Sequence, residues 1–122
     1  MSNPYTTTRQ EVAAMLATNL SGVTVYDAAP HTVGAPCAAV MFSDSGQWIA
    51  TMGNVHMAVG CFVSNSADNS TVATNLEQLV YDTRQAIWAS GLTPGEVDKP
   101  DNLSDMGALV AFVPIMVRAD CN

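Results

Sequence analysis

The nine residues from Val55 to Val63 constrain the fold more than any other segment of the chain. Successive side chains of a β-strand point to opposite sides of the sheet, and here the alternation produces two faces without Asp, Glu, Lys or Arg. One face consists of Val55, Met57, Val59, Cys61 and Val63, and the other of His56, Ala58, Gly60 and Phe62. We therefore expect a strand with one face in the core and a second face that either belongs to the core as well or is covered by a subunit or partner.

A helix is predicted near the N-terminus. Residues Thr8–Glu11 form a capping box, in which the Thr8 hydroxyl accepts from the Glu11 amide while the Glu11 side chain reaches back. The apolar stripe that follows consists of Val12, Met15, Leu16 and Leu20. Gly22 supplies the left-handed residue that ends such a helix.

A second helix is predicted over residues 72–90. Its buried face would consist of Val72, Leu76, Leu79, Val80, Thr83 and Ile87. Asn69 or Ser70 can cap its start, and Gly91 stands where a C-terminal glycine belongs.

Three further strands are expected. Residues 23–26 are β-branched and aromatic, and residues 37–42 form a continuous apolar run that is typical of a strand buried on both faces. In residues 109–117 the odd-numbered and even-numbered side chains would point to opposite faces of a strand. Pro114 within this strand must lie at an edge or a bulge because it has no N–H to donate. Between the second helix and this last strand, residues 93–107 predict a long loop with a short strand near Glu96 and Val97.

The resulting order is α-β-β-β-α-β. It predicts one α+β domain that spans residues 1–122, with an antiparallel or mixed sheet and both helices packed on one face. The length suits a single core. The composition, with 48% apolar and 12% charged residues, excludes an intrinsically disordered chain.

The net charge of -7 restricts the partners. Four bases lie in four separate segments, so they cannot form the cluster that grips a phosphate backbone or an anionic membrane. The longest apolar stretch, residues 108–117, is about half of the ~20 residues that a membrane helix needs. The polar N-terminal residues lack the features of a signal peptide, so we expect a cytosolic product without membrane attachment.

Residues that could support catalysis or bind a metal are scattered. Cys37, Cys61 and Cys121 are an odd number without a C-x-x-C pair, which favours reduced core thiols. His31 and His56 do not have the spacing of metal ligands relative to these cysteines. Nucleophile-elbow, P-loop and dinucleotide-binding motifs are absent from the sequence. We therefore expect no catalytic, cofactor-binding or metal site, and a protein that is not an enzyme.

Candidate contact residues are of two kinds. Phe62 and Trp88 are large aromatic residues that could meet a neighbouring molecule, although a role in the core is an equally good interpretation. The acidic candidates lie in the loop, where they could form a charged rim at a subunit contact or a solvated surface, and they are Glu96, Asp98, Asp101 and Asp105.

In the order and texture of its elements, the chain resembles the tail terminator proteins, a family of small neck proteins of long-tailed bacteriophages. The resemblance covers nearly the whole chain and lies in the order of the elements, not in an invariant motif. The residues that support it are the N-terminal helix, Val23–Asp27, Pro36–Met41, Val55–Val63, the helix around Asn75–Asp82, the acidic loop and the closing strand Gly107–Arg118.

This resemblance implies a structural protein of the virion neck, present in the host cytoplasm during assembly. It implies a hexameric ring that caps the tail tube, ends its polymerisation and offers a surface for head joining, while DNA passes through the lumen without specific binding. The partners would be further copies of the chain, the tail tube protein and a head-side connector or stopper protein. One alternative is a head-tail connector or stopper of the same neck; a more distant one is a small-molecule enzyme or binding module, with the ligand between helices and sheet.

Overall fold

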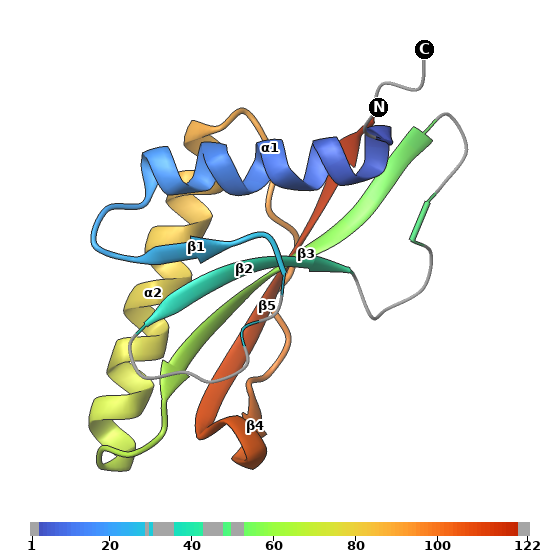
Figure 1. Ribbon diagram of the computed structural model, residues 1–122. Coiled ribbons are helices and arrows are strands. Elements are labelled where there is room, and N and C mark those ends of the chain that lie inside the picture. The colour runs from blue at the N-terminus through green and yellow to red at the C-terminus, as the bar shows by residue number, and fades with distance from the viewer. Residues whose placement is uncertain (1–2, 29, 31–35, 43–47, 50–52, 120–122) are drawn as a thin grey trace.

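The computed structural model describes residues 3–28, 30, 36–42, 48–49 and 53–119 (Figure 1). It confirms the α+β class and the predicted order of helices and main strands. The elements are α1 (Pro4–Asn19), β1 (Thr24–Tyr26), β2 (Cys37–Phe42), β3 (Asn54–Ser64), α2 (Asn69–Ala89), β4 (Asp101–Leu103), the 3₁₀ turn η2 (Ser104–Met106) and β5 (Ala108–Arg118).

The five strands form one mixed sheet in the order β1-β2-β3-β5-β4. β1 pairs with β2 in parallel, and the other three pairings are antiparallel. β3 and β5, each of eleven residues, pair along their whole length. They form the centre of the sheet, while β1 and β4, of three residues each, form its edges (Figure 1).

α1 begins five residues earlier than the capping box predicted, because Asn3 and not Thr8 is its N-cap. Asn3 is the N-cap, and its side-chain oxygen accepts from the backbone N–H of Thr6 at 2.8 Å. Pro4 occupies the first helical turn, where its missing N–H costs nothing because that turn has no intrahelical acceptor to bond. Thr8 lies inside the helix, and its hydroxyl donates to the Pro4 carbonyl instead of capping. The Asn-Pro pair therefore competes successfully with the Thr-x-x-Glu pattern.

α2 extends close to the predicted range, with Asp68 at its N-cap and Ser90 at its C-cap. Gly91 follows with φ of 83° and Gly22 follows α1 with φ of 77°. Both values lie in the left-handed region, as predicted from their positions after the helices. The C-terminal ends of the two helices meet, because the Asn19 side-chain amide donates to the Ser90 hydroxyl at 3.1 Å.

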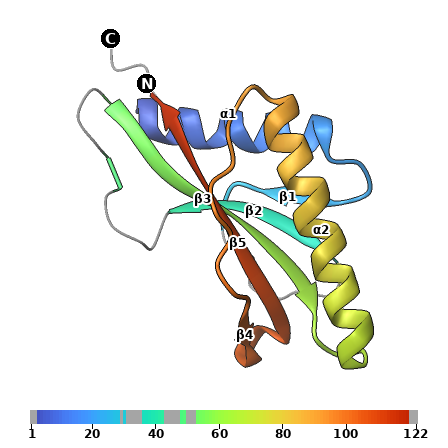
Figure 2. The same cartoon turned by 180° about the vertical axis from the view of Figure 1, so that it is seen from behind.

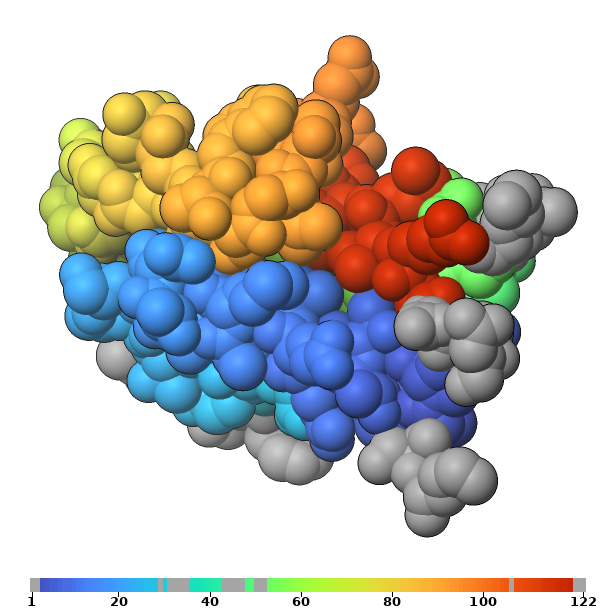
Figure 3. All heavy atoms as spheres, turned by 90° about the horizontal axis from the view of Figure 1, so that it is seen from above, coloured from blue at the N-terminus to red at the C-terminus, as the bar shows by residue number. Residues whose placement is uncertain are grey.

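Both helices pack on the same face of the sheet and form the main core (Figure 2). From above, α1 lies beside the C-terminal half of α2 (Figure 3). The odd-numbered residues of β3 point into this core, as their alternation predicted. The helices and the C-cap of α1 contribute mainly Val12, Leu16, Leu20, Val72, Leu76, Leu79 and Ile87 to it.

The other face of the sheet carries a second, smaller apolar cluster, which consists of Cys37, Ala39, Phe62, Ala108 and Val110. The Phe62 ring lies over Gly60, where an added Cβ would come within 2.7 Å of the ring. The second face of β3 is therefore largely buried within this chain. Of the two interpretations of this face, the structure supports a role in the core for Phe62, which is 1% exposed.

The region between α2 and β5 contains one short strand, but at a different position from the one predicted. The short strand is Asp101–Leu103, which pairs with the start of β5, and not the neighbourhood of Glu96 and Val97. At Pro114 β5 has no strand on its outer side; instead, the Gly95 N–H donates to the Pro114 carbonyl at 2.8 Å. Because that carbonyl points outwards, the Pro114 nitrogen does too, and the ladder with β3 loses no hydrogen bond. Pro114 thus occupies an outer edge, as proline requires.

Candidate functional site

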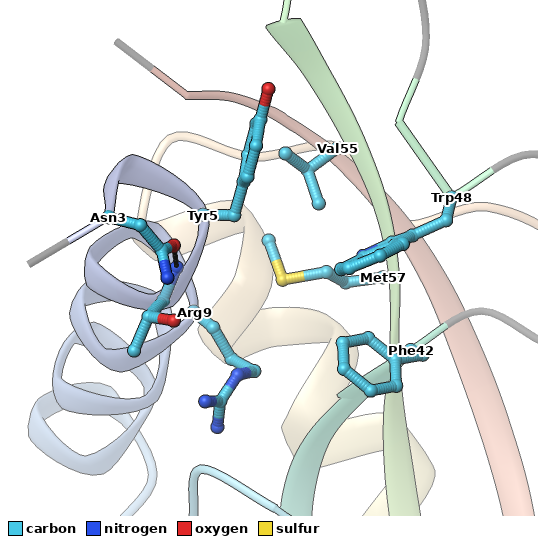
Figure 4. Close-up of a pocket in the computed structure, with 8 residues that line it drawn as sticks. Asn3, Tyr5, Arg9, Phe42, Trp48, Val55 and Met57 are labelled. Atoms are coloured by element: carbon cyan, nitrogen blue, oxygen red, sulfur yellow. Dashed lines mark hydrogen bonds between the residues drawn. The ribbon is translucent and has the colours of Figure 1, made fainter. Parts of the chain in front are cut away.

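A hollow lies between the N-terminal half of α1 and the adjoining ends of β2 and β3 (Figure 4). Its volume is about 180 Å³, and its lining is more apolar than polar. α1 places Tyr5 and Arg9 on one side of it, one helical turn apart, and the sheet supplies the opposite side. The complete lining is Asn3, Tyr5, Thr6, Arg9, Phe42, Trp48, Val55 and Met57.

Two exposed aromatic rings form the sheet side of this hollow. Phe42, the last residue of β2, is 60% exposed, and Trp48 is 47% exposed. Their ring centroids are 4.9 Å apart with an interplanar angle of 68°, an edge-to-face contact. The Trp48 carbonyl accepts from the His56 N–H at 2.7 Å, which attaches this tryptophan to β3. The pair is therefore held in place by the sheet while much of its apolar surface faces outwards.

Arg9 is the charged group of the site. One guanidinium nitrogen donates to the backbone carbonyl of Asp27, and the Asp27 carboxylate lies 3.9 Å from the same nitrogen. A guanidinium has five N–H donors, so most of them have no partner among the described residues. Because the ion pair is long and half-exposed on the aspartate side, it contributes little stability and leaves Arg9 able to bind an anionic group.

A second hollow of about 310 Å³ adjoins the first and shares Arg9 and Phe42 with it. It lies beside the outer edge of β2 and is lined by Arg9, Asp27, Ala28, Val40, Met41 and Phe42. β1 pairs only with the first half of β2, as far as Ala39. The outer edge of Val40–Phe42 therefore has no strand neighbour in the part of the chain that the structure describes.

The described residues around the two hollows supply groups that can bind a ligand. Apolar walls, one guanidinium and an open strand edge can hold an extended chain with an anionic side group. The described residues contain no group of three His, Cys, Asp or Glu side chains that could hold a metal ion.

The two described cysteines lie away from the hollows and are both buried. Burial raises the pKa of Cys37. It also raises the pKa of Cys61, to about 11, against an opposing interaction with the Thr83 hydroxyl. A thiolate nucleophile at neutral pH would need a lowered pKa and exposure. His31 and Cys121 lie outside the described residues.

The predicted contact residues lie at several separate places. Trp88 is 53% exposed on α2, whereas Phe62 is only 1% exposed and has no surface to offer a partner. The four acids of the predicted rim are all exposed, and they lie between α2 and β5, on the far side of the sheet order from β1. The structure therefore does not bring Trp88, Phe62 and the acids into one site.

The acidic segment is attached to the fold at its start. Arg84 donates to the Gly95 carbonyl at 2.8 Å, and the Gly95 N–H bonds to β5. Beyond this point Glu96, Asp98, Lys99 and Pro100 are exposed. The segment is thus held next to β5 while its carboxylates face solvent.

Sequence reasoning missed the residues that form the hollows. Arg9 and Asp27 are 18 positions apart, and Phe42 and Trp48 belong to different segments. Two sequence features could have indicated the hollow: an arginine one helical turn beyond Tyr5 and aromatic residues at the end of a buried strand.

No protein-family model matches this chain, and no curated protein is significantly similar to it in sequence. Among the described residues, the helices are too short or too polar to cross a membrane. The function must therefore be argued from the surface of the molecule.

Proposed function

We propose that this protein is a structural assembly protein, of the tail terminator type, which acts as one subunit of a ring at the neck of a long-tailed bacteriophage. The observation that supports it best is the distribution of exposed large apolar side chains. Among the described residues, six of them are 43–61% exposed. They lie on β1, on α2, on β5 and around the end of β2, and they are Tyr26, Phe42, Trp48, Tyr81, Trp88 and Met116.

These side chains are grouped in ways that suit contacts with several neighbours. Phe42 and Trp48 touch each other, and Tyr81 and Trp88 are two helical turns apart on the exposed side of α2. Large aromatic side chains dominate the energetics of protein interfaces. A ring subunit needs such surfaces in more than one direction, towards its two ring neighbours, the tube and the head-side protein.

The mechanism we propose is geometric. Head-to-tail contacts between identical subunits close into a ring when the rotation between them is suitable. Such a ring occupies the growing face of the tail tube, so no further tube protein can add, and its opposite face receives the head-side connector or stopper. The charge of -7 favours a lumen that DNA crosses without being held.

The test is electron microscopy of lysates from an infection in which this protein is depleted. Tails of uncontrolled, excessive length beside unattached heads are expected. Tails of normal length beside unattached heads would instead assign the protein to the head-side connectors or stoppers, and unaltered infectious particles would exclude an assembly role.

One observation favours a second class, a small-molecule binding module. The hollow of about 180 Å³ lies between a helix and the sheet and contains Arg9, as such a module requires. A thermal-shift screen of small carboxylates and phosphates, with Arg9→Gln as the control, separates the two classes. Stabilisation of the parent protein alone, together with a monomer at all concentrations, would favour the binding module.

A further inference from the structure

The outward side of α2 carries a continuous stripe of uncharged residues. The buried side of this helix faces the sheet, and the opposite side faces the viewer in Figure 2. Residues three or four positions apart share one side of a helix. On the outward side such residues run almost the whole length of α2, all of them are exposed, and they are Ser70, Thr74, Gln78, Tyr81, Gln85 and Trp88. This spacing is that of the seam along which two helices pack against each other.

The side chains of this stripe differ in size along the helix. The C-terminal half carries the two rings of Tyr81 and Trp88, whereas the stripe begins with the small Ser70. An antiparallel pair of these helices, centred between Gln78 and Tyr81, places Trp88 of each copy against the partner's Ser70. The Gln78 amide donates to Asp82 at 2.9 Å, which draws it off the stripe and leaves room for the partner's Tyr81. A parallel pair would place each ring against its own copy and leave a gap at the small residues, so packing favours the antiparallel arrangement.

The charges beside the stripe favour the same arrangement. Glu77 and Arg84 lie on one flank of it, and Asp82 lies on the other. In antiparallel helices equal flanks meet, so Glu77 of each copy lies beside the partner's Arg84. In parallel helices opposite flanks meet, and Glu77 would face the partner's Asp82, which is repulsive. Arg84 uses one N–H on the Gly95 carbonyl at 2.8 Å and has further N–H groups for such a contact.

We propose that α2 binds α2 of a second copy of this chain, antiparallel and across a two-fold axis that passes between Gln78 and Tyr81. Two copies with a charge of -7 each repel one another, which an uncharged seam with two crossed ion pairs reduces at the point of contact. The same surface is used on both copies, so the contact joins two copies and stops there. It is additional to the head-to-tail contacts of the proposed ring.

The first test is sedimentation velocity of the full-length protein from ~1 μM to ~1 mM. The stripe is about 27 Å long, a small contact, so we expect a dimer with a dissociation constant on the order of 10–100 μM. Tyr81→Ala should weaken dimerisation at least ~10-fold because it removes the ring at the centre of the seam. The matched control is Tyr26→Ala, which removes another exposed ring, on β1, and should dimerise like the parent.

Circular dichroism should show both variants folded, because both rings are exposed. A parent that stays monomeric throughout, or equal dimerisation of the parent and Tyr81→Ala, would overturn the proposal. So would an equal loss in Tyr26→Ala, since the contact would then not lie on α2.

The orientation of the two helices is tested by Glu77→Lys. In the antiparallel pair the new lysine faces the partner's Arg84 on both sides of the axis, so dimerisation should weaken by at least ~3-fold. In a parallel pair it would face the partner's Asp82, and dimerisation would strengthen. An unchanged or strengthened dimer would therefore overturn the antiparallel contact.

The register is tested by disulfide formation, in a chain with Cys121→Ser so that the remaining native cysteines are the buried Cys37 and Cys61. Thr74→Cys of one copy lies opposite Gln85→Cys of the other in the antiparallel pair, so an oxidised mixture of the two variants should give a linked dimer on a non-reducing gel. Each variant alone should stay unlinked, because equal positions are about 16 Å apart along the helix, beyond the reach of a disulfide. Linkage of each variant alone, or none in the mixture, would contradict this register. Tail length in the depleted infection tests the ring separately.

Discussion

The two halves of β2 have opposite environments within six residues. At Cys37–Ala39, the closed end, the strand pairs with β1 and β3 and is buried on both faces. At Val40–Phe42, the open end, its strand neighbour among the described residues is β3 alone, and exposure rises from 0% at Val40 to 60% at Phe42. The closed end stabilises the fold by packing, whereas much of the apolar surface of the open end is not used by the fold. Surface that folding does not bury is available for binding.

Replacing one phenylalanine beside each end of β2 with alanine should show most clearly which end stabilises the fold. Phe62, which lies opposite Cys37, is 1% exposed, so Phe62→Ala should lower the free energy of unfolding by about 3–5 kcal/mol through lost burial and a cavity. Phe42→Ala should lower it by less than about 1 kcal/mol, because most of that ring is already in water. Urea unfolding of both variants measures the contrast. Equal losses would mean that the open end is as much a part of the core as the closed end.

The next largest effect is a loss of stability at alkaline pH, which comes from Cys61, the residue paired with Ala38 of the closed end. Burial raises the pKa of Cys61 from 9.0 to about 11, so the unfolded chain releases this proton first as the pH rises. The contribution of the protonated Cys61 thiol to the free energy of unfolding is complete below pH 9 and is lost between about pH 9 and 11. It amounts to about 2–3 kcal/mol.

The measurement is chemical unfolding at pH 7 to 11 in the parent and in Cys61→Ala. The variant starts less stable at pH 7 because it has lost packing, so the slopes should be compared and not the absolute values. The parent should show the steeper alkaline loss. Parallel profiles would contradict a buried, protonated Cys61.

The smallest effect concerns a polar group of α2 that contacts Cys61, the residue paired with Ala38 of the closed end. The Thr83 side chain is fully buried, and its hydroxyl makes no hydrogen bond to oxygen or nitrogen within the described residues. The Cys61 thiol, a weak partner, is the group with which it interacts. Thr83→Val keeps the shape and removes the unsatisfied hydroxyl, so we expect a gain of about 1 kcal/mol. Thermal unfolding tests this, with Thr83→Ser as a control that keeps the hydroxyl and should be destabilised.

Much of the candidate site could not be predicted, because its residues meet only through the sheet. Arg9 was visible as one of four scattered bases and Trp48 as one of two tryptophans. Their proximity depends on how α1 packs over the end of β2, where Arg9 and Trp48 line the same hollow. For Phe62, the uncharged strand face left a core role and a partner contact both open. The structure decides for the core, because Met41 and the smaller residues of the same sheet surround the ring.

The sequence by itself determined the helices, the long strands and the face of β3 that enters the core, because periodicity, caps and glycines act within a few residues. Even the early start of α1 was encoded locally, in Asn3 and Pro4. The tertiary structure alone decided the strand order, the parallel pairing of β1 with β2 and the open edge at Val40–Phe42. Those features depend on which distant segments pair, and the pairing is set by the total burial of the sheet and not by any single segment.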